Sequence, residues 1–205
     1  MARDGIIYVL LPVIALVIAL ALGYWYVALA FALVAAFMAF FFRDPNRRVP
    51  TDADIVVSPA DGRVTRIEKL AAEDSQSGTL VSIFLSVFDV HINRAPIKGE
   101  ITDVTYTKGR FVIATRSDAS IVNEQNALTI QNERMTVVCK QIAGILARRI
   151  VCWKRAGDRV ALGDRFGLIK FSSRTDLILP PTVEINVKVG DRVKGGLTVI
   201  GRMRA

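Results

Sequence analysis

The sequence RFGLIKFSSRTDLILPP, residues 165–181, consists of two short apolar runs around a polar centre. Residues 166–171 alternate as a strand does, and residues 177–179 form a second apolar run before two prolines, which end a strand. The polar centre is Ser172, Ser173, Arg174, Thr175 and Asp176. A polar hairpin turn between two strands is the simplest interpretation of this composition.

The chain from residue 54 onward has the same β-rich character. Short runs rich in valine, isoleucine and threonine recur about every ten residues and are separated by turn residues. One of these runs is RFVIAT, residues 110–115, and the only helical pattern in this part lies around residues 142–149. This spacing predicts a mainly β body, built as a sandwich or a barrel.

The first part of the chain is apolar instead. Residues 5–42 contain no charged side chain over 38 positions. One helix needs about 20 residues to cross a bilayer, so this length predicts a helical hairpin of residues 5–22 and 24–42 with a turn at Gly23. A single long tilted helix and a re-entrant pair are the alternatives. Pro45 and Pro50 then mark a linker, residues 43–53, before a body of residues 54–205.

The charge distribution predicts a membrane surface as the partner of this body. The net charge is +8, and it belongs to residues 43–205, the linker and the body, because Arg3 and Asp4 cancel. Arg43, Arg47 and Arg48 flank the apolar segment, which favours a body on the cytoplasmic side of the cell membrane. Basic residues attract anionic lipid headgroups. The charges are dispersed and no nucleic-acid recognition motif accompanies them, so we expect no nucleic-acid partner.

Two further stretches contain polar residues of catalytic type. SPADG, residues 58–62, includes Asp61, and FDVHINRAP, residues 88–96, includes His91, the one histidine of the chain. Asp89 lies two positions before His91, on the same face if the strand continues. A carboxylate there would orient the imidazole for proton transfer. The two cysteines, Cys139 and Cys152, lie in apolar settings without metal-ligand neighbours, so we expect reduced thiols and no metal.

Six motifs in order resemble the phosphatidylserine decarboxylases of the short, two-helix type found in bacteria and archaea. The motifs are RDP at 43–45, SPADG at 58–62, VHINR at 90–94, NEQNA at 123–127, QIAGILARRIV at 141–151 and RFGLIKFSSRTD at 165–176. They cover almost the whole chain. The resemblance implies a β-rich barrel-sandwich body and the conversion of phosphatidylserine to phosphatidylethanolamine.

The resemblance also implies a cofactor that the chain makes from itself. Ser173 would attack the carbonyl of residue 172, and the chain would divide into residues 1–172 and 173–205, with a pyruvoyl group at the new N-terminus. Asp61, His91 and Ser173 match the catalytic residues of the family. The two chains of the precursor would remain partners.

Substrate binding and two departures from the family pattern complete these expectations. Arg94, Lys98 and Arg110 are candidates to bind the phosphodiester, and a solvated basic face is the alternative for them. Ser172 stands where the family usually has glycine, and Arg94 stands where many relatives have a second histidine. An uncleaved precursor, a non-catalytic membrane-tethered module and a decarboxylase of archaeal ether lipids are therefore the other interpretations. Homo-oligomerisation is left open.

Overall fold

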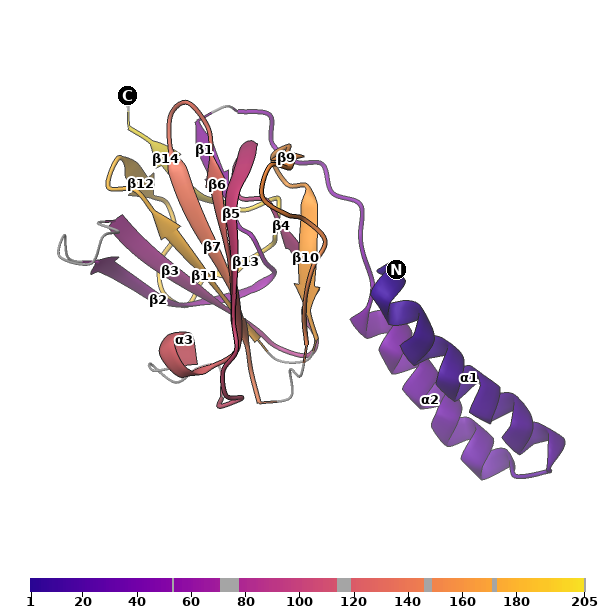
Figure 1. The fold of residues 1–205 in the computed structure, drawn as a ribbon. Coiled ribbons are helices and arrows are strands. Elements are labelled where there is room, and N and C mark those ends of the chain that lie inside the picture. Colours follow the sequence, from indigo (N-terminus) through magenta and orange to yellow (C-terminus); the bar gives the residue numbers. More distant parts are fainter. Residues whose placement is uncertain (53, 71–77, 114–118, 146–148, 171–172, 205) are drawn as a thin grey trace. The chain divides into compact units, whose positions relative to one another are not determined.

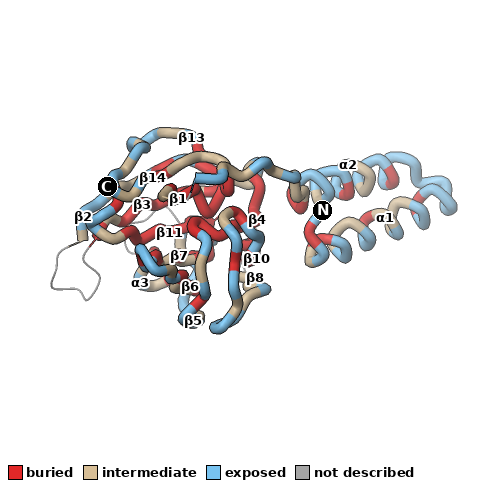
Figure 2. Tube along the Cα trace, turned by 90° about the horizontal axis from the view of Figure 1, so that it is seen from above, coloured by how far each residue is buried: buried red, intermediate tan, exposed pale blue. Residues whose placement is uncertain are grey.

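The computed structural model describes residues 1–52, 54–70, 78–113, 119–145, 149–170 and 173–204. The chain divides into two compact units, Met1–Asn46 and Arg47–Ala205. The first unit is helical and largely exposed, whereas the strands of the second are largely buried (Figures 1 and 2). A mainly β body with an N-terminal helical hairpin is thereby confirmed.

The first unit is a hairpin of two apolar helices. The short turn η1 (Arg3–Gly5) leads into α1 (Ile6–Ala21), and α2 (Trp25–Phe41) returns alongside it. Gly23 makes the connection with a φ of 77°, a conformation that residues with a side chain rarely adopt. At the open end, the Ala2 N–H donates to the Phe42 carbonyl over 2.9 Å. The single-helix alternative is therefore wrong.

The second unit contains three antiparallel sheets. The largest has the strand order β13-β2-β3-β11-β7-β6-β5-β9, and two smaller sheets have the orders β1-β14-β12 and β4-β10-β8. The strands are β1 (Ile55–Val57), β2 (Gly62–Leu70), β3 (Gly78–Leu85), β4 (Ile92–Arg94), β5 (Gly99–Thr107), β6 (Gln125–Gln131), β7 (Thr136–Ala143), β8 (Ile150–Cys152), β9 (Arg159–Val160), β10 (Arg165–Ile169), β11 (Ser173–Leu179), β12 (Val183–Ile185), β13 (Arg192–Val193) and β14 (Val199–Met203). One short helix, α3 (Ala119–Val122), precedes β6.

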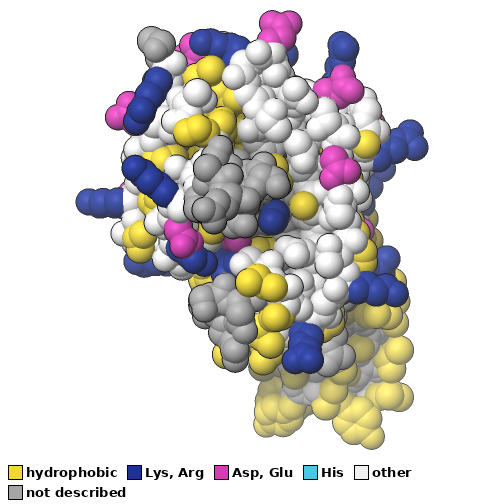
Figure 3. All heavy atoms as spheres, turned by 60° about the vertical axis from the view of Figure 1, so that its left-hand side comes forward, with side chains coloured by type: hydrophobic (Ala, Val, Ile, Leu, Met, Phe, Trp, Pro, Cys, Tyr) yellow, Lys and Arg dark blue, Asp and Glu magenta, His cyan; other side chains and the backbone are white. Residues whose placement is uncertain are grey.

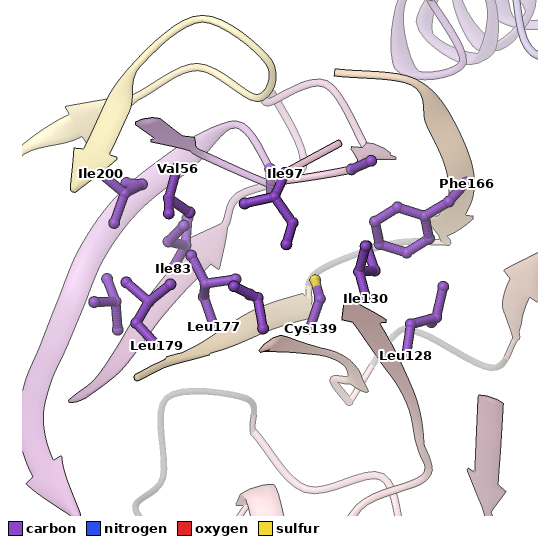
Figure 4. Close-up of a cluster of buried hydrophobic side chains, with 14 of the residues drawn as sticks. Val56, Ile83, Ile97, Leu128, Ile130, Cys139, Phe166, Leu177, Leu179 and Ile200 are labelled. Atoms are coloured by element: carbon purple, nitrogen blue, oxygen red, sulfur yellow. The ribbon is translucent and has the colours of Figure 1, made fainter. Parts of the chain in front are cut away.

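One apolar core lies between the large sheet and the two smaller ones (Figure 4). Ile83 and Leu177 from the large sheet meet Val56 and Ile200 from one small sheet and Phe166 from the other. All five of these side chains are completely buried. Outer strands such as β2 and β5 bury mainly one face, whereas the central strands β3 and β11 bury nearly all of their residues.

Strand β11 occupies the middle of the large sheet. It pairs with β3 on one side and with β7 on the other, and all of its residues are buried. The interpretation of residues 173–176 as a polar turn is therefore wrong, because backbone pairing on both sides holds them in a strand. Ser172 and Phe171 lie outside the described residues.

Two local predictions also differ from the structure. Phe111, Val112 and Ile113 form no strand, and Arg110 takes part only in an isolated bridge with Asn123. The helical pattern around residues 142–149 begins inside β7, since this strand extends to Ala143.

Candidate active site

Ser173 is the first residue of β11 and is completely buried. Its backbone lies opposite Leu85, the last residue of β3, and Ala143, the last residue of β7. Its Oγ atom has no hydrogen-bond partner among the described residues. A buried hydroxyl without a partner is costly and requires an explanation, and a role in chemistry is one such explanation.

His91 lies in the segment that connects β3 to β4, and its side chain is buried. Its Nδ1 atom is 2.9 Å from the carbonyl oxygen of Asp89. Because a carbonyl oxygen only accepts hydrogen bonds, Nδ1 carries the proton in the neutral ring and Nε2 carries the lone pair. The Asp89 carboxylate instead accepts from the N–H and the hydroxyl of Ser86. The prediction that this carboxylate orients His91 is wrong; the backbone of the same residue does so.

The structure brings the segments of His91 and Ser173 together. Leu85, which precedes the His91 segment, pairs with Ser173, and the Ile169 N–H donates to the His91 carbonyl over 3.3 Å. Ser173 and His91 therefore lie at the same end of the body, the lower end in Figure 1, where α3 and the end of β10 lie.

A chain of buried amide side chains supports this arrangement. Asn93 Nδ2 donates to Thr175 Oγ1 over 3.1 Å, and Gln141 Nε2 donates to Asn93 Oδ1 over 2.9 Å. Asn126 Nδ2 donates in turn to Gln141 Oε1 over 3.1 Å. Asn93 also contacts the Pro59 carbonyl at 3.5 Å. Five motifs of the sequence thus meet in one network. Two of its members, Asn93 and Thr175, lie two positions after His91 and Ser173, respectively.

Asp61 occupies the loop that adjoins this network. Its two carboxylate oxygens accept from the two terminal nitrogens of Arg47 at 2.6 and 2.7 Å, and Oδ1 also accepts from the Gly195 N–H at 2.9 Å. Arg47 donates in addition to the Gly195 carbonyl. The described contacts of the Asp61 carboxylate therefore fix the loop against residues 47 and 195, while the Pro59 carbonyl joins that loop to β4 through the Arg94 N–H.

A buried ion pair follows Ser173 on the opposite face of β11. Arg174 Nε lies 2.9 Å from Asp176 Oδ1, and an Arg174 terminal nitrogen donates to Asp176 Oδ2 over 3.0 Å. Burial raises the pKa of the Asp176 carboxyl above its ordinary value, and Arg174, Ser82 and Lys140 act against this rise. The pair adds two side-chain contacts near the start of β11.

The three candidate cations occupy different places. Arg94 is buried, and its terminal nitrogen donates to the Gly163 carbonyl over 3.1 Å. Lys98 is exposed but precedes β5, at the end of the sheet opposite Ser173. Arg110 is exposed and follows β5, at the end that Ser173 shares. The structure thus brings Arg110, and not Lys98, to the Ser173 end.

The described residues contain no second candidate site, either for thiol chemistry or for a metal ion. Cys139 and Cys152 are free cysteines, and burial raises the pKa of both thiols. Among the described residues, no group of three or more His, Cys, Asp and Glu side chains could hold a metal ion. The thiols are therefore protonated at neutral pH and serve the packing of the core.

Sequence reasoning missed the residues that connect the motifs. Asn93, Gln141 and Thr175 lie within quoted motifs, but each is a polar residue at a position where strand alternation places a core side chain. That conflict between polarity and position is the signal that could have found them. For Arg47 the sequence predicts only a position beside the membrane segment, whereas the structure makes it the ion-pair partner of Asp61.

A buried serine at a strand start, next to a segment with a buried histidine, defines a β enzyme with a candidate nucleophile and a candidate base. The family model for phosphatidylserine decarboxylase matches residues 34–201. The chain belongs to the phosphatidylserine decarboxylase family, and it is a decarboxylase by that membership.

Similar proteins from several bacteria bear the name phosphatidylserine decarboxylase proenzyme. The protein of Solibacter usitatus is 48% identical over 202 residues, which are 97% of this chain and 94% of the relative. The protein of Nitrosomonas eutropha is 45% identical, with 94% and 89% covered. The protein of Carboxydothermus hydrogenoformans is 42% identical, with 100% and 97% covered.

Proposed function

We propose that this chain decarboxylates phosphatidylserine to phosphatidylethanolamine with a pyruvoyl group that it makes from Ser173. The observation that carries the proposal is the Ser173 hydroxyl, which is buried, lacks a hydrogen-bond partner among the described residues and begins the central strand β11. The word proenzyme in the names of the relatives supports a precursor that is cut.

The surroundings of Ser173 suit a pyruvoyl group. Such a group replaces the hydroxymethyl carbon with a methyl and the amine with a ketone, so it suits an apolar environment. Leu85 and Ala143, the register partners of Ser173, are both completely buried. The group would be held by the pairing of β11 with β3 and β7, by the Thr175 hydrogen bond to Asn93 and by the Arg174–Asp176 pair.

The self-cleavage uses only groups of this chain and one water molecule. The Oγ of Ser173 attacks the carbonyl carbon of residue 172 while its proton passes to His91 Nε2; the proton then passes to the Ser173 nitrogen as the C–N bond breaks, and the amide becomes an ester with a free amine. Loss of the α-proton of Ser173 then breaks the Cβ–Oγ bond and releases the carboxylate of residue 172. The dehydroalanine that results takes up water and releases ammonia, which leaves the pyruvoyl group.

The two products stay together because their strands are paired. Residues 173–205 contribute β11, β12, β13 and β14. Of these, β11 pairs with β3 and β7, β13 with β2, and β14 with β1, all from the larger product. Cleavage between 172 and 173 therefore leaves the core and these four strand pairings intact.

In turnover, a bound pyruvoyl ketone supplies the electron sink for the charge left when carbon dioxide departs. His91 supplies the proton transfer: Nδ1 is fixed by the Asp89 carbonyl, which leaves Nε2 to move the proton. Arg110 is the candidate to bind the phosphodiester because it is exposed at the Ser173 end.

The apolar hairpin supports a place at the cell membrane. Residues 3–21 form an apolar helical segment of 19 residues that is long enough to cross a membrane, whereas Trp25–Phe41 is shorter. We propose that this unit anchors the chain, with the body on the cytoplasmic side because Arg43, Arg47 and Arg48 follow the second helix.

The proposed function is tested with purified full-length protein in phosphatidylserine vesicles. Phosphatidylethanolamine formation is followed by mass spectrometry of the extracted lipid. We expect product from the protein as given and none from Ser173→Ala, which has no hydroxyl for the attack. Product formation by Ser173→Ala would remove the pyruvoyl group from the reaction.

A further inference from the structure

The body exposes large apolar side chains mainly at one end. Beyond residue 46, eight such side chains are exposed among the described residues, and Trp153 and Val189 are two of them. The other six, which we call the apolar rim, are Phe88, Tyr106, Phe111, Ile113, Ile121 and Ile145. Ile121 is 79% exposed and Phe88 is 67% exposed, far more than side chains of this size usually are in a water-facing surface.

Backbone pairing places every member of the rim at the Ser173 end. Phe88 lies in the turn after Leu85, and Ile145 follows Ala143; both neighbours pair with Ser173. Tyr106 is the second-to-last residue of β5. The remaining three, Phe111, Ile113 and Ile121, lie around Asn123. The Asn123 amide accepts from the Val112 N–H and donates to the Val112 carbonyl, and it also donates to the Ala143 carbonyl over 2.7 Å.

Basic residues accompany the rim. Lys108 and Arg110 are exposed between Tyr106 and Phe111. The remaining positive charge of the body is spread over the surface, and Figure 3 shows lysine and arginine side chains dispersed over one face. Apolar side chains next to cations are the composition of a surface that inserts into the headgroup region of an anionic bilayer.

We propose that the apolar rim is a second membrane contact of this protein, formed by the body itself, which inserts into the surface of a bilayer rich in anionic phospholipid. The proposal rests on the proposed function in one respect: a lipid substrate must reach Ser173, and the rim surrounds the same end of the sheet. An exposed rim there lets the headgroup pass from the bilayer to the site without crossing water. The hairpin then holds the protein at the membrane, and the rim orients the site toward the lipid.

The first test measures insertion directly and needs no activity. Ile121→Trp is made in a full-length background with Trp25→Phe and Trp153→Phe, and the protein is reconstituted into phosphatidylserine-containing vesicles with brominated acyl chains. We expect the fluorescence of the new tryptophan to be quenched relative to vesicles without bromine. The control restores Trp153 instead, and its fluorescence should change little. Equal quenching of the tryptophan at position 121 and of the restored Trp153 would refute the rim as an insertion surface. Shielding of the tryptophan at position 121 by a second copy of the chain, in place of lipid, would refute it as well.

The second test measures what insertion does for turnover. Ile113→Ser/Ile121→Ser protein is reconstituted in vesicles and given either long-chain phosphatidylserine in the bilayer or short-chain phosphatidylserine dissolved in water. We expect roughly tenfold or greater loss on the bilayer substrate, because two large apolar side chains no longer insert, and little change on the dissolved one. Trp153→Ser is the matched control and should change neither. Equal losses on both substrates would contradict the proposal, whereas quenching without any activity on either substrate would retain the rim and overturn the proposed function.

Discussion

Replacing Thr175 with valine tests the buried amide network with almost no change in shape. The substitution removes the oxygen that accepts from Asn93 Nδ2 at 3.1 Å, and the contact left to this nitrogen is the Pro59 carbonyl at 3.5 Å. A buried donor without a good acceptor costs about 1–3 kcal/mol. We therefore expect the free energy of unfolding to fall by about that amount, which is a large fraction of the stability of a domain.

The network joins residues two positions from His91 and two positions from Ser173, so, if these groups act as proposed, we expect self-cleavage to slow. Each 1.4 kcal/mol lost from that geometry slows a reaction about tenfold, so a loss between roughly fivefold and a hundredfold corresponds to the range above. The slowing should exceed any effect of Thr136→Val, a control on an exposed threonine of β7.

Two assays separate stability from chemistry. Urea unfolding in mild detergent, followed by circular dichroism, is measured in a Ser173→Ala background so that every chain is uncut. Cleavage is followed by gel electrophoresis after synthesis of the chain with Ser173 in place. A Thr175→Val protein with the stability and cleavage rate of Thr136→Val would refute the role given to the network.

Three further predictions concern single charged or catalytic groups. Arg174→Met leaves the Asp176 carboxylate buried without its partner, so we expect a loss of about 3–5 kcal/mol in unfolding free energy at neutral pH. Burial already raises the pKa of the Asp176 carboxyl, and the loss of Arg174 raises it further, so the stability of this variant should fall as pH rises above the ordinary carboxyl range. Equal shifts of the variant's urea midpoint from that of the unchanged chain at pH 5 and pH 8 would contradict this. Asp61→Asn should slow cleavage and also destabilise the protein, because Arg47 loses its charged partner; wild-type cleavage and melting temperature in this variant would exclude both roles. His91→Ala protein that has already been cleaved should make no phosphatidylethanolamine, and full turnover by it would remove His91 from the decarboxylation.

The sequence predicts the fold class well because strand alternation and turn residues are local signals. The apolar stretch and Gly23 likewise predict the hairpin, since both act within a few residues. Composition alone predicts a turn at the polar centre around Ser173, because the place of these residues in the middle of the large sheet depends on pairing with β3 and β7, which are far away in the chain.

The candidate site follows the same division. Motifs point to Ser173 and His91 as candidates, and the structure brings their segments together. Local patterns could not predict that Asp89 fixes His91 through its carbonyl, nor that Asp61 binds Arg47, because both depend on which loops meet after folding. Similarly, Lys98 and Arg110 are near in sequence, but β5 separates them by its whole length.

The central claim is that the chain cuts itself between residues 172 and 173, and intact mass under denaturing conditions tests it most directly. We expect two chains, residues 1–172 and 173–205, with the smaller one lighter by one ammonia than a serine-terminated chain. Cleavage should be slow or partial with Ser172 and at least as fast in Ser172→Gly, since glycine puts no side chain beside the attacked carbonyl. Ser173→Ala should give one uncut mass. Only the full-length mass, both in this chain and in Ser172→Gly, would contradict the account.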